Sequence, residues 1–388
     1  MKQFRFHVVA LPHTRTAMSH SACAFTMKIL HFCQMMHSLG HEVYHYGVEG
    51  SEVQECTTEH VQVLSKSEQE GFFGPYNPDA LYEVDWSGRA SYWKLTNERA
   101  AAEIIKRKHP GDFLCLMMGT LNLPLANAVG SGVMPVEYGI GYNGTFAKYR
   151  VFESYAHMHK IWGAQGGFDP DGKFYDAVIP NYLNPADYPY KREKENYYLY
   201  LGRLIKRKGI HIAVETCKRL GVRLVMAGQG CTKVEGNRIH CSDGEVYTGD
   251  NLEYVGFATG EKRARLYQNA IATFVPTTYI EPFGAVAIES QMAGTPAITT
   301  DFGAFTETVE HGKTGFRCHT LDQFVWAARH APELDSWYCH TRAVANYGME
   351  RVRYRYQEYF EMLADVWKRG WYEEHPERQD LNWLRLYP

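Results

Sequence analysis

The feature that most constrains the fold is an alternation of short apolar runs with amphipathic stretches, which occurs in both halves of the chain. In the second half, "IATFVPT" (271–277) and "TPAITTD" (295–301) have the character of buried strands, and "FGAVAIESQMAG" (283–294) between them has that of a helix. In the first half, a strand-like run at Phe4–Leu11 is followed by a helical stretch that stops at Gly40 and by the extended "HEVYHYG". Strands that alternate with helices form parallel sheets covered on both faces. The sequence therefore predicts an α/β fold with doubly wound, Rossmann-like sheets.

Two such domains are predicted from the length of the chain and from a break near its middle. The chain has 388 residues, more than one ordinary core contains. Residues 176–196 read "DAVIPNYLNPADYPYKREKEN", where prolines and a charged run are typical of a domain boundary. We place the first domain at 1–182 and the second at 183–348, and we expect the chain after Leu321 to be helical.

Composition narrows the class of protein. The formal net charge of −3 gives no sign of a nucleic-acid or anionic-membrane partner. The nine cysteines contain no C-x-x-C pair, so we expect neither a disulfide framework nor a structural zinc site, and a reducing cytoplasm is favoured. The apolar run at the start is broken by His7 and Pro12 and does not predict a signal peptide, and no window reaches the roughly 18 apolar residues of a membrane span. We expect a cytoplasmic protein without an integral membrane segment; peripheral membrane contact stays open.

Two loops of the second half are expected to meet at the carboxyl edge of its sheet, where ligands bind in doubly wound folds. The loop after "YYLYLGRL" carries Arg203, Lys206, Arg207 and Lys208. The loop after "IATFVPT" carries "YIEPFGA" and leads into a helix that begins near Phe283–Ala285. The first N–H groups of that helix lack intrahelical partners, and Gly284 has no Cβ, so a phosphate can approach the backbone. Arg203 and Lys208 could neutralise a diphosphate there, whereas we expect Lys206 and Arg207 to be solvated.

Glu281 and Glu289 lie eight positions apart around this helix start. Glu281 precedes the helix and Glu289 lies in its second turn. A carboxylate can accept two hydrogen bonds from a vicinal diol, as in a ribose or a sugar. One helix could thus bind the ribose, the phosphates and the sugar of a nucleotide sugar. The plainer alternative is a helix-start charge and a solvated glutamate, since helix N-termini favour acids in any case.

These stretches resemble the donor domain of retaining GT-B glycosyltransferases, best the glycogen-synthase-like superfamily (glycosyltransferase family four). The resemblance is carried by "GRLIKRKG", "EPFGAVAIESQMAGTPAITT" and "HGKTGF", and it is close over about residues 197–316. The family's pattern of Glu, seven residues, Glu is matched by Glu281 and Glu289, and its basic pair by Arg203 and Lys208. In the first half only "SLGHEVYHYG" and "IPNYLNPADYPY" support the resemblance.

The resemblance implies a GT-B fold, in which two Rossmann-like domains face each other across a cleft and the C-terminal helices (349–388) cross back onto the first domain. It implies transfer of a sugar from a nucleotide-diphosphate donor, most simply a UDP- or GDP-sugar, to an acceptor hydroxyl, with retention and without a metal or other cofactor. By this resemblance the catalytic residues are Glu281, Arg203 and Lys208. The donor-binding residues are Gly202, Phe283, Gly284, Ala285 and Glu289.

Two features depart from the family. A Gly-Gly pair is common after the first strand, but "PHTRTAMSHSACAF" stands here, with Ser21 and Ala22 closest by position. Many members have a histidine near the reacting sugar, but the stretch after "DFLCLMMG" has none. His13 or His20 is the candidate for the sugar or acceptor site instead. The acceptor stays undetermined: a glycan, a lipid-linked sugar, a small molecule or a modified nucleic-acid base.

Several alternatives stay open. The chain could be an epimerase or a phosphorylase of GT-B fold, or a non-catalytic scaffold that binds nucleotide sugars. Asp169 and Asp171 in "FDPDG" could bind a metal, but the composition is that of a turn. The aromatic residues of 72–95 could form an acceptor platform, although we favour packing. Residues 147–163, "AKYRVFESYAHMHKIWG", are predicted to form one helix, on which His157 and His159 face apart.

Overall fold

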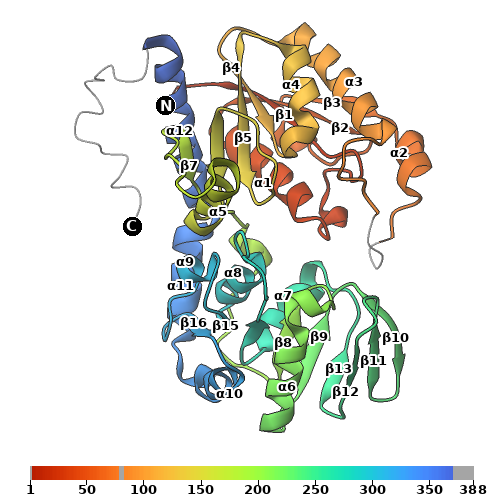
Figure 1. The fold of residues 1–388 in the computed structure, drawn as a ribbon, viewed down its shortest axis with the longest axis vertical. Helices are drawn as coiled ribbons and strands as arrows, with labels where there is room; N and C mark the ends of the chain where they lie inside the picture. Colours follow the sequence, from red (N-terminus) through yellow and green to blue (C-terminus); the bar gives the residue numbers. More distant parts are fainter. Residues whose placement is uncertain (1, 78–82, 370–388) are drawn as a thin grey trace.

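A computed structural model describes residues 2–77 and 83–369, and it shows two α/β domains stacked along the long axis of the molecule (Figure 1). In the described part of the chain, the first domain has a seven-stranded parallel sheet of order β3-β2-β1-β4-β5-β6-β7. Its strands are β1 Arg5–Val9, β2 Glu42–Val48, β3 Glu59–Leu64, β4 Asp112–Leu116, β5 Val133–Ile140, β6 Tyr149–Phe152 and β7 Asp176–Val178. Its helices are α1 Ala24–Ser38, α2 Lys66–Phe73, α3 Ser91–Arg107, α4 Leu123–Val129 and α5 Tyr155–Gly166.

The second domain has, within the described residues, a six-stranded parallel sheet of order β13-β9-β8-β14-β15-β16. Its strands are β8 Tyr198–Leu201, β9 Leu224–Ala227, β13 Leu252–Tyr254, β14 Thr273–Val275, β15 Ala297–Thr300 and β16 Gly315–Cys318. Its helices are α6 Ile210–Leu220, α7 Gly260–Asn269, α8 Ala285–Met292, α9 Phe305–Thr308, α10 Leu321–His330 and α11 Ser336–Tyr347. Both orders reverse around the first strand of the sheet, which is the doubly wound pattern predicted from the sequence.

An antiparallel meander replaces a crossover helix between β9 and β13. Its strands are β10 Cys231–Glu235, β11 Arg238–Cys241 and β12 Val246–Thr248. The turns between them contain Gly236 and Gly244, both at positive φ. Figure 1 shows the meander at the outer edge of the second domain, beside β13.

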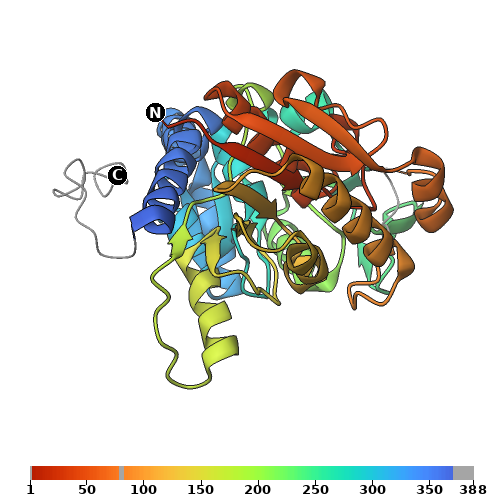
Figure 2. The same ribbon diagram turned by 90° about the horizontal axis from the view of Figure 1, so that it is seen from above.

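The last described helix, α12 (Met349–Arg369), leaves the second domain and packs on the first. The ring of Phe360 lies 4.6 Å from that of Phe6 on β1, and the ring of Tyr356 lies 5.3 Å from that of Phe32 on α1. In both Figure 1 and Figure 2 this helix runs along one side of the first sheet. The predicted helical return is confirmed for α12; residues 370–388, also part of that prediction, lie outside the described residues.

The chain crosses between the domains at two neighbouring points. The N–H of Leu183 donates to the carbonyl of Tyr347 at 3.0 Å, and the N–H of Met349 donates to the carbonyl of Leu183 at 3.0 Å. The two crossings are therefore hydrogen-bonded to each other.

The prediction of one helix over 147–163 is wrong. Tyr149–Phe152 is the strand β6, which is buried and pairs with both β5 and β7. Ser154 then caps α5, because its hydroxyl accepts the N–H of His157 at 3.1 Å. Pairing within the sheet outweighs the local helical pattern of this stretch.

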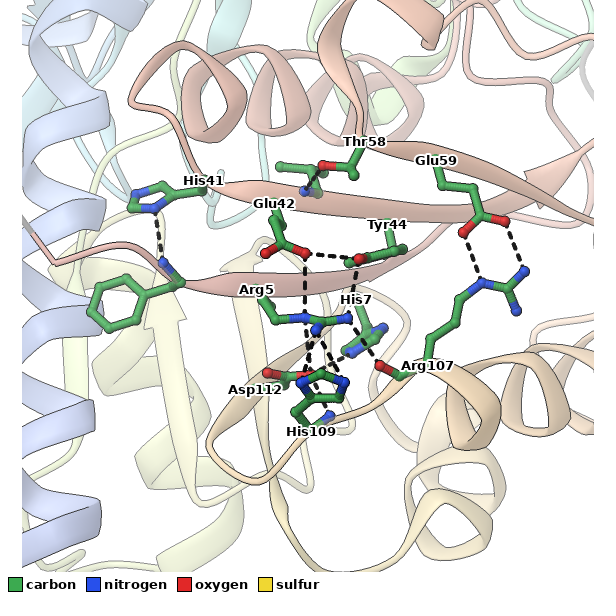
Figure 3. A network of polar contacts seen from close by, with 12 residues as sticks. Arg5, His7, His41, Glu42, Tyr44, Thr58, Glu59, Arg107, His109 and Asp112 are labelled. Atoms are coloured by element: carbon green, nitrogen blue, oxygen red, sulfur yellow. Dashed lines mark hydrogen bonds and ion pairs between the residues drawn. The ribbon is translucent and has the colours of Figure 1, made fainter.

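Polar side chains form a network at the starting edge of the first sheet, away from the carboxyl ends of its strands (Figure 3). Arg5 begins β1, and its guanidinium donates to the hydroxyl of Tyr44 at 3.1 Å and lies 3.6 Å from the carboxylate of Asp112, which begins β4. The buried His7 lies between that carboxylate, at 3.0 Å, and the hydroxyl of Tyr46, at 2.8 Å. These contacts link β1, β2 and β4 to one another.

Candidate functional site

The two loops that the sequence places at the carboxyl edge of the second sheet lie against each other. The loop after β8 contains the single turn Lys206–Lys208 and then Gly209, which has φ +75°. A Cβ on Gly209 would lie 1.8 Å from the carbonyl oxygen of Pro276, which follows β14. Only glycine allows the two backbones to approach this closely.

Lys208 and Glu281 meet where these loops touch. The ammonium of Lys208 lies 3.1 Å from a carboxylate oxygen of Glu281 and also donates to the hydroxyl of Tyr279. The guanidinium of Arg207 lies 4.4 Å from the centre of the Tyr279 ring, so Arg207 stacks on a side chain of the site. Burial, reinforced by the charge of Glu281, raises the pKa of Tyr279. Tyr279 therefore stays a hydroxyl that can donate and accept hydrogen bonds beside both charges.

The other basic residues of the loop differ in their surroundings. The side chain of Arg203 is exposed, and its charge opposes the rise in the Tyr279 pKa, which places it near the same site. Lys206 lies on the outer side, where its N–H donates to Asp243 at 2.7 Å and its ammonium to Glu245 at 2.9 Å. The meander turn between β11 and β12 thus holds the loop that carries Lys208.

The helix predicted to start near Phe283–Ala285 is α8, with Ala285 as its first residue. Gly284 precedes it in a left-handed conformation, and a Cβ there would lie 2.5 Å from the ring of Phe305. Phe283 points into the core, where its ring packs 5.6 Å from that of Tyr347. Gly284 and Ala285 thus remain at the helix start, but the Phe283 side chain is a packing residue and only its backbone can face a ligand.

Glu289 is buried in α8, and both of its carboxylate oxygens have partners. One oxygen pairs with the guanidinium of Arg263 on α7, and the hydroxyl of Tyr267 donates to the other at 2.6 Å. Burial alone would lower the pKa of Arg263, but the facing charge of Glu289 raises it above its ordinary value. Burial and the same charge raise the pKa of Tyr267. Glu289 therefore lies in an ordered ion pair and is not the solvated glutamate of the plainer alternative.

His13 and His20 are buried among aromatic residues of the first domain. The ring of His20 stacks on that of Tyr76 at 4.0 Å, and the ring of His13 meets that of Trp86 edge-on at 5.7 Å. Burial lowers the pKa of each histidine to about 4, so both are neutral at pH 7. The neighbouring Ser21 contacts the second domain, because its hydroxyl lies 2.8 Å from that of Thr259 at the start of α7.

The aromatic stretch of residues 72–95 has two parts. Tyr92 and Trp93 are buried, which is the packing that we favoured, while Trp86 is 54% exposed beside His13. Residues 78–82 lie outside the described residues.

The sequence did not point to the start of α5, which meets the second domain beside Glu281. The hydroxyl of Ser154 donates to the carbonyl of Pro282 at 2.7 Å. The carboxylate of Glu307 accepts the N–H groups of Tyr155 and Ala156 at 3.0 and 2.9 Å. Figure 1 shows α5 directly above α8 and α9. The sequence does contain a hint of this helix start, namely a serine that can cap a helix and a histidine shortly after it. The incorrect prediction of one helix over 147–163 placed both residues in the interior of that helix.

His157 and a buried ion pair line the first-domain side of this contact. Burial lowers the pKa of His157 to about 4, and the Glu281 charge, which opposes that shift, acts across the domain boundary. Lys28 on α1 is buried, pairs with Glu153 after β6 and donates to the carbonyl of Gly139 at 2.9 Å. A Cβ on Gly141 would lie 2.6 Å from Glu153 and 3.4 Å from Pro282, so this pair lies immediately behind the loop of Glu281.

Comparison with known proteins gives the family of the second domain. Residues 188–331 match the family model "Glycosyl transferases group 1". The second domain belongs to this family. A glycogen synthase of Mycobacterium tuberculosis is 32% identical over 171 residues, which cover 41% of this chain and 40% of the relative. The chain thus spans about two fifths of the length of that curated relative.

Solved structures share the fold over more than nine tenths of the chain, in both domains. A glycosyltransferase involved in avilamycin A biosynthesis has a TM-score of 0.65 at 18% identity, covering 93% of this chain and 98% of that one. The Anabaena protein HepE, solved in complex with UDP and glucose, has a TM-score of 0.64 at 13% identity, covering 92% and 100%. These likenesses confirm the predicted GT-B fold of two Rossmann-like domains. Within the described residues, no helix is long and apolar enough to cross a membrane.

Proposed function

We propose that this protein transfers a sugar from a nucleotide-diphosphate donor to an acceptor hydroxyl, at the face where its two domains meet. The observation that carries the proposal is the contact of Lys208 with Glu281 beside the start of α8, within a group 1 glycosyl transferase domain. A cation, a carboxylate and free helix N–H groups at one point form a site for a phosphate joined to a sugar. The complex of HepE with UDP and glucose supports the same class of donor.

The diphosphate would bind between Arg203, Lys208 and the backbone from Gly284 to Ala285, with Gly202 leaving space beside it. Lys208 is already held by Glu281 and Tyr279, so its position is set before a donor arrives. When the bond to the sugar breaks, charge develops on the leaving diphosphate. Fixed positive groups stabilise that charge more than they stabilise the intact donor, which lowers the barrier.

Glu281 would orient the sugar through its hydroxyl groups, and Glu289 would bind the ribose. His157 and Ser154 face the loop of Glu281 from the first domain, and His13 and His20 line the same domain nearer to α7. A neutral histidine can accept a proton or donate a hydrogen bond, so these residues are the candidates for the acceptor side.

Retention at the anomeric carbon, independence from metal ions, and a UDP- or GDP-sugar as the donor are parts of this proposal. The acceptor is any of the hydroxyl-bearing classes named from the sequence. A cytoplasmic location is proposed because the nine cysteines are free in the structure, which suits a reducing compartment.

The test is donor turnover. A panel of UDP- and GDP-sugars is incubated with and without acceptor glycans, with and without EDTA, and nucleoside diphosphate is measured together with the anomeric configuration of the product. We expect Lys208→Gln to reduce nucleotide release about 100-fold or more, as the loss of one charge-stabilising donor does in other enzymes. Lys313→Gln is the matched control. Lys313 forms a surface pair with Glu310 just before β16, at the amino ends of the strands, whereas Lys208 lies at their carboxyl ends.

Each outcome separates one class of function. Conversion of the donor sugar without acceptor indicates an epimerase, and dependence on free phosphate indicates a phosphorylase. Binding without any turnover, hydrolysis included, indicates a scaffold. Equal rates in wild type and Lys208→Gln contradict the proposed site.

A further inference from the structure

Glu289 presents a physical problem that its two neighbours on α7 solve. Its side chain is 4% exposed, and an isolated carboxylate at such a depth would take up a proton. The Arg263 guanidinium faces one oxygen and the Tyr267 hydroxyl donates to the other at 2.6 Å. A carboxylate oxygen has two lone pairs, so each oxygen keeps capacity for a second donor.

One side of this cluster reaches the protein surface. Arg263 keeps 19% of its side chain exposed, so the pair lies at the margin of the core. Arg263 is in the first turns of α7, whose capping residue Thr259 contacts Ser21 of the first domain at 2.8 Å. Diol hydroxyls arriving between the domains could therefore reach Glu289 past the guanidinium.

We propose that Arg263 and Tyr267 are positioning residues that hold Glu289 ionised and oriented to accept the two hydroxyls of a ribose. The inference rests on the proposed function and deepens it, because it names the side chains that make the site prefer a ribose to a 2′-deoxyribose. The two residues act through Glu289: one supplies the opposite charge and the other fixes the plane of the carboxylate.

Other titratable groups around Glu289 come from the segment between the domains. Burial raises the pKa of Asp187, with Arg263 opposing and Glu289 reinforcing the shift. Burial likewise raises the pKa of Tyr188, whose ring centre lies 5.9 Å from the Arg263 guanidinium. Arg263 thus faces two carboxyl groups and two phenols, and within the described residues it is the cation whose charge acts on all of them. Replacing Arg263 therefore leaves the Glu289 carboxylate among acidic side chains without a compensating cation.

The experiment compares ribose with deoxyribose. Dissociation constants of UDP, GDP and their 2′-deoxy counterparts are measured between pH 6 and 8.5 for wild type, Arg263→Met, Arg263→Lys and Tyr267→Phe. The wild type should prefer the ribonucleotide about 10- to 100-fold, the range for a hydrogen bond to a charged group, with little dependence on pH. Arg265→Met is the matched control, because Arg265 lies on the same helix in an exposed pair with Glu261.

Arg263→Met should lose this preference at low pH and regain part of it as the pH rises, because the uncompensated Glu289 ionises only at higher pH. Arg263→Lys should restore much of the preference, and Arg265→Met should keep all of it. Tyr267→Phe removes one hydrogen bond and no charge, so it should weaken the preference even if Arg263→Met fails to fold.

Three results overturn the inference. The first is an unchanged ribose preference in both Arg263→Met and Tyr267→Phe. The second is an equal weakening of ribo- and deoxyribonucleotides at every pH, which is what a merely structural role predicts. The third is a wild type that binds nucleotides without regard to the 2′-hydroxyl. A wild type that binds no nucleotide at all is a different result, since it overturns the proposed function and the inference with it.

Discussion

Gly284→Ala tests whether the start of α8 is built as described. Gly284 has φ +79° and ψ 51°, and a Cβ there would lie 2.5 Å from the ring of Phe305. Gly221, which ends α6, has φ +66° and ψ 31° with nothing within 4 Å of its Cβ position. Gly221→Ala therefore carries the backbone cost alone, whereas Gly284→Ala carries the backbone cost and the clash.

The magnitudes separate the two variants. A left-handed conformation costs an alanine about 1–2 kcal/mol, and both variants gain the same small stabilisation through the unfolded chain. Forcing an extra carbon into a packed core costs about 1–3 kcal/mol more. We expect the free energy of unfolding to fall by about 1–2 kcal/mol in Gly221→Ala and by about 2–5 kcal/mol in Gly284→Ala.

Urea unfolding followed by circular dichroism measures the difference, and both glycines lie in the second domain, so the same transition is compared. With a slope of about 2 kcal/mol per M, the midpoint of Gly284→Ala should lie about 0.5–1.5 M below that of Gly221→Ala. An equal or higher midpoint for Gly284→Ala would refute the packing of the helix start on Phe305, and with it the placement of the backbone N–H groups at the site.

Three further substitutions test two hydrogen-bonded contacts and one buried histidine. Glu307→Gln removes the charge bound by the first amides of α5, so these amides should exchange with deuterium faster in mass spectrometry; unchanged exchange would mean that the domains do not dock there. Asp243→Ala removes the acceptor of the Lys206 N–H and should raise the KM for the donor about two- to tenfold, whereas Asp243→Asn should not; equal effects would exclude a positioning role. Burial lowers the pKa of His20 to about 4, so the unfolded chain binds this proton near pH 6.5 and the folded protein only near pH 4. Stability is lost as the pH falls through that window, and His20→Phe should reduce the loss in acid unfolding; an undiminished loss would show that His20 does not cause it.

The contact of Lys208 with Glu281 could be predicted from the sequence, because a parallel sheet brings their two loops together. Lys208 and Glu281 follow β8 and β14, two neighbouring parallel strands whose carboxyl ends share one edge. The start of α8 after Gly284 could also be predicted from local sequence, because a glycine directly precedes an apolar helical run. No long-range information is needed for either.

The partners of Glu289 could not be predicted, because they depend on which face of α7 turns inward. "GEKRARLYQNA" contains Arg263 and Arg265 two positions apart, and nothing local shows that the first pairs with Glu289 while the second forms an exposed pair with Glu261. The strand at Tyr149–Phe152 was missed for a related reason: its pairing with β5 and β7 is tertiary. The meander did leave a signal, since "EGN" and "SDG" between alternating residues are typical of hairpin turns.

The central claim is tested most directly by thermal melting of wild type and Lys208→Gln with UDP, GDP, ADP, CDP and dTDP. Glu289→Ala is less suitable, because it leaves the mostly covered charge of Arg263 without its partner and lowers stability by itself. A ligand at 100 times its dissociation constant stabilises the folded state by about 2.7 kcal/mol, which melting resolves. We predict that UDP or GDP raises the wild-type midpoint by several degrees and that Lys208→Gln loses most of this shift. No shift with any nucleotide, or an equal shift in both proteins, would contradict a donor site at Lys208 and Glu281.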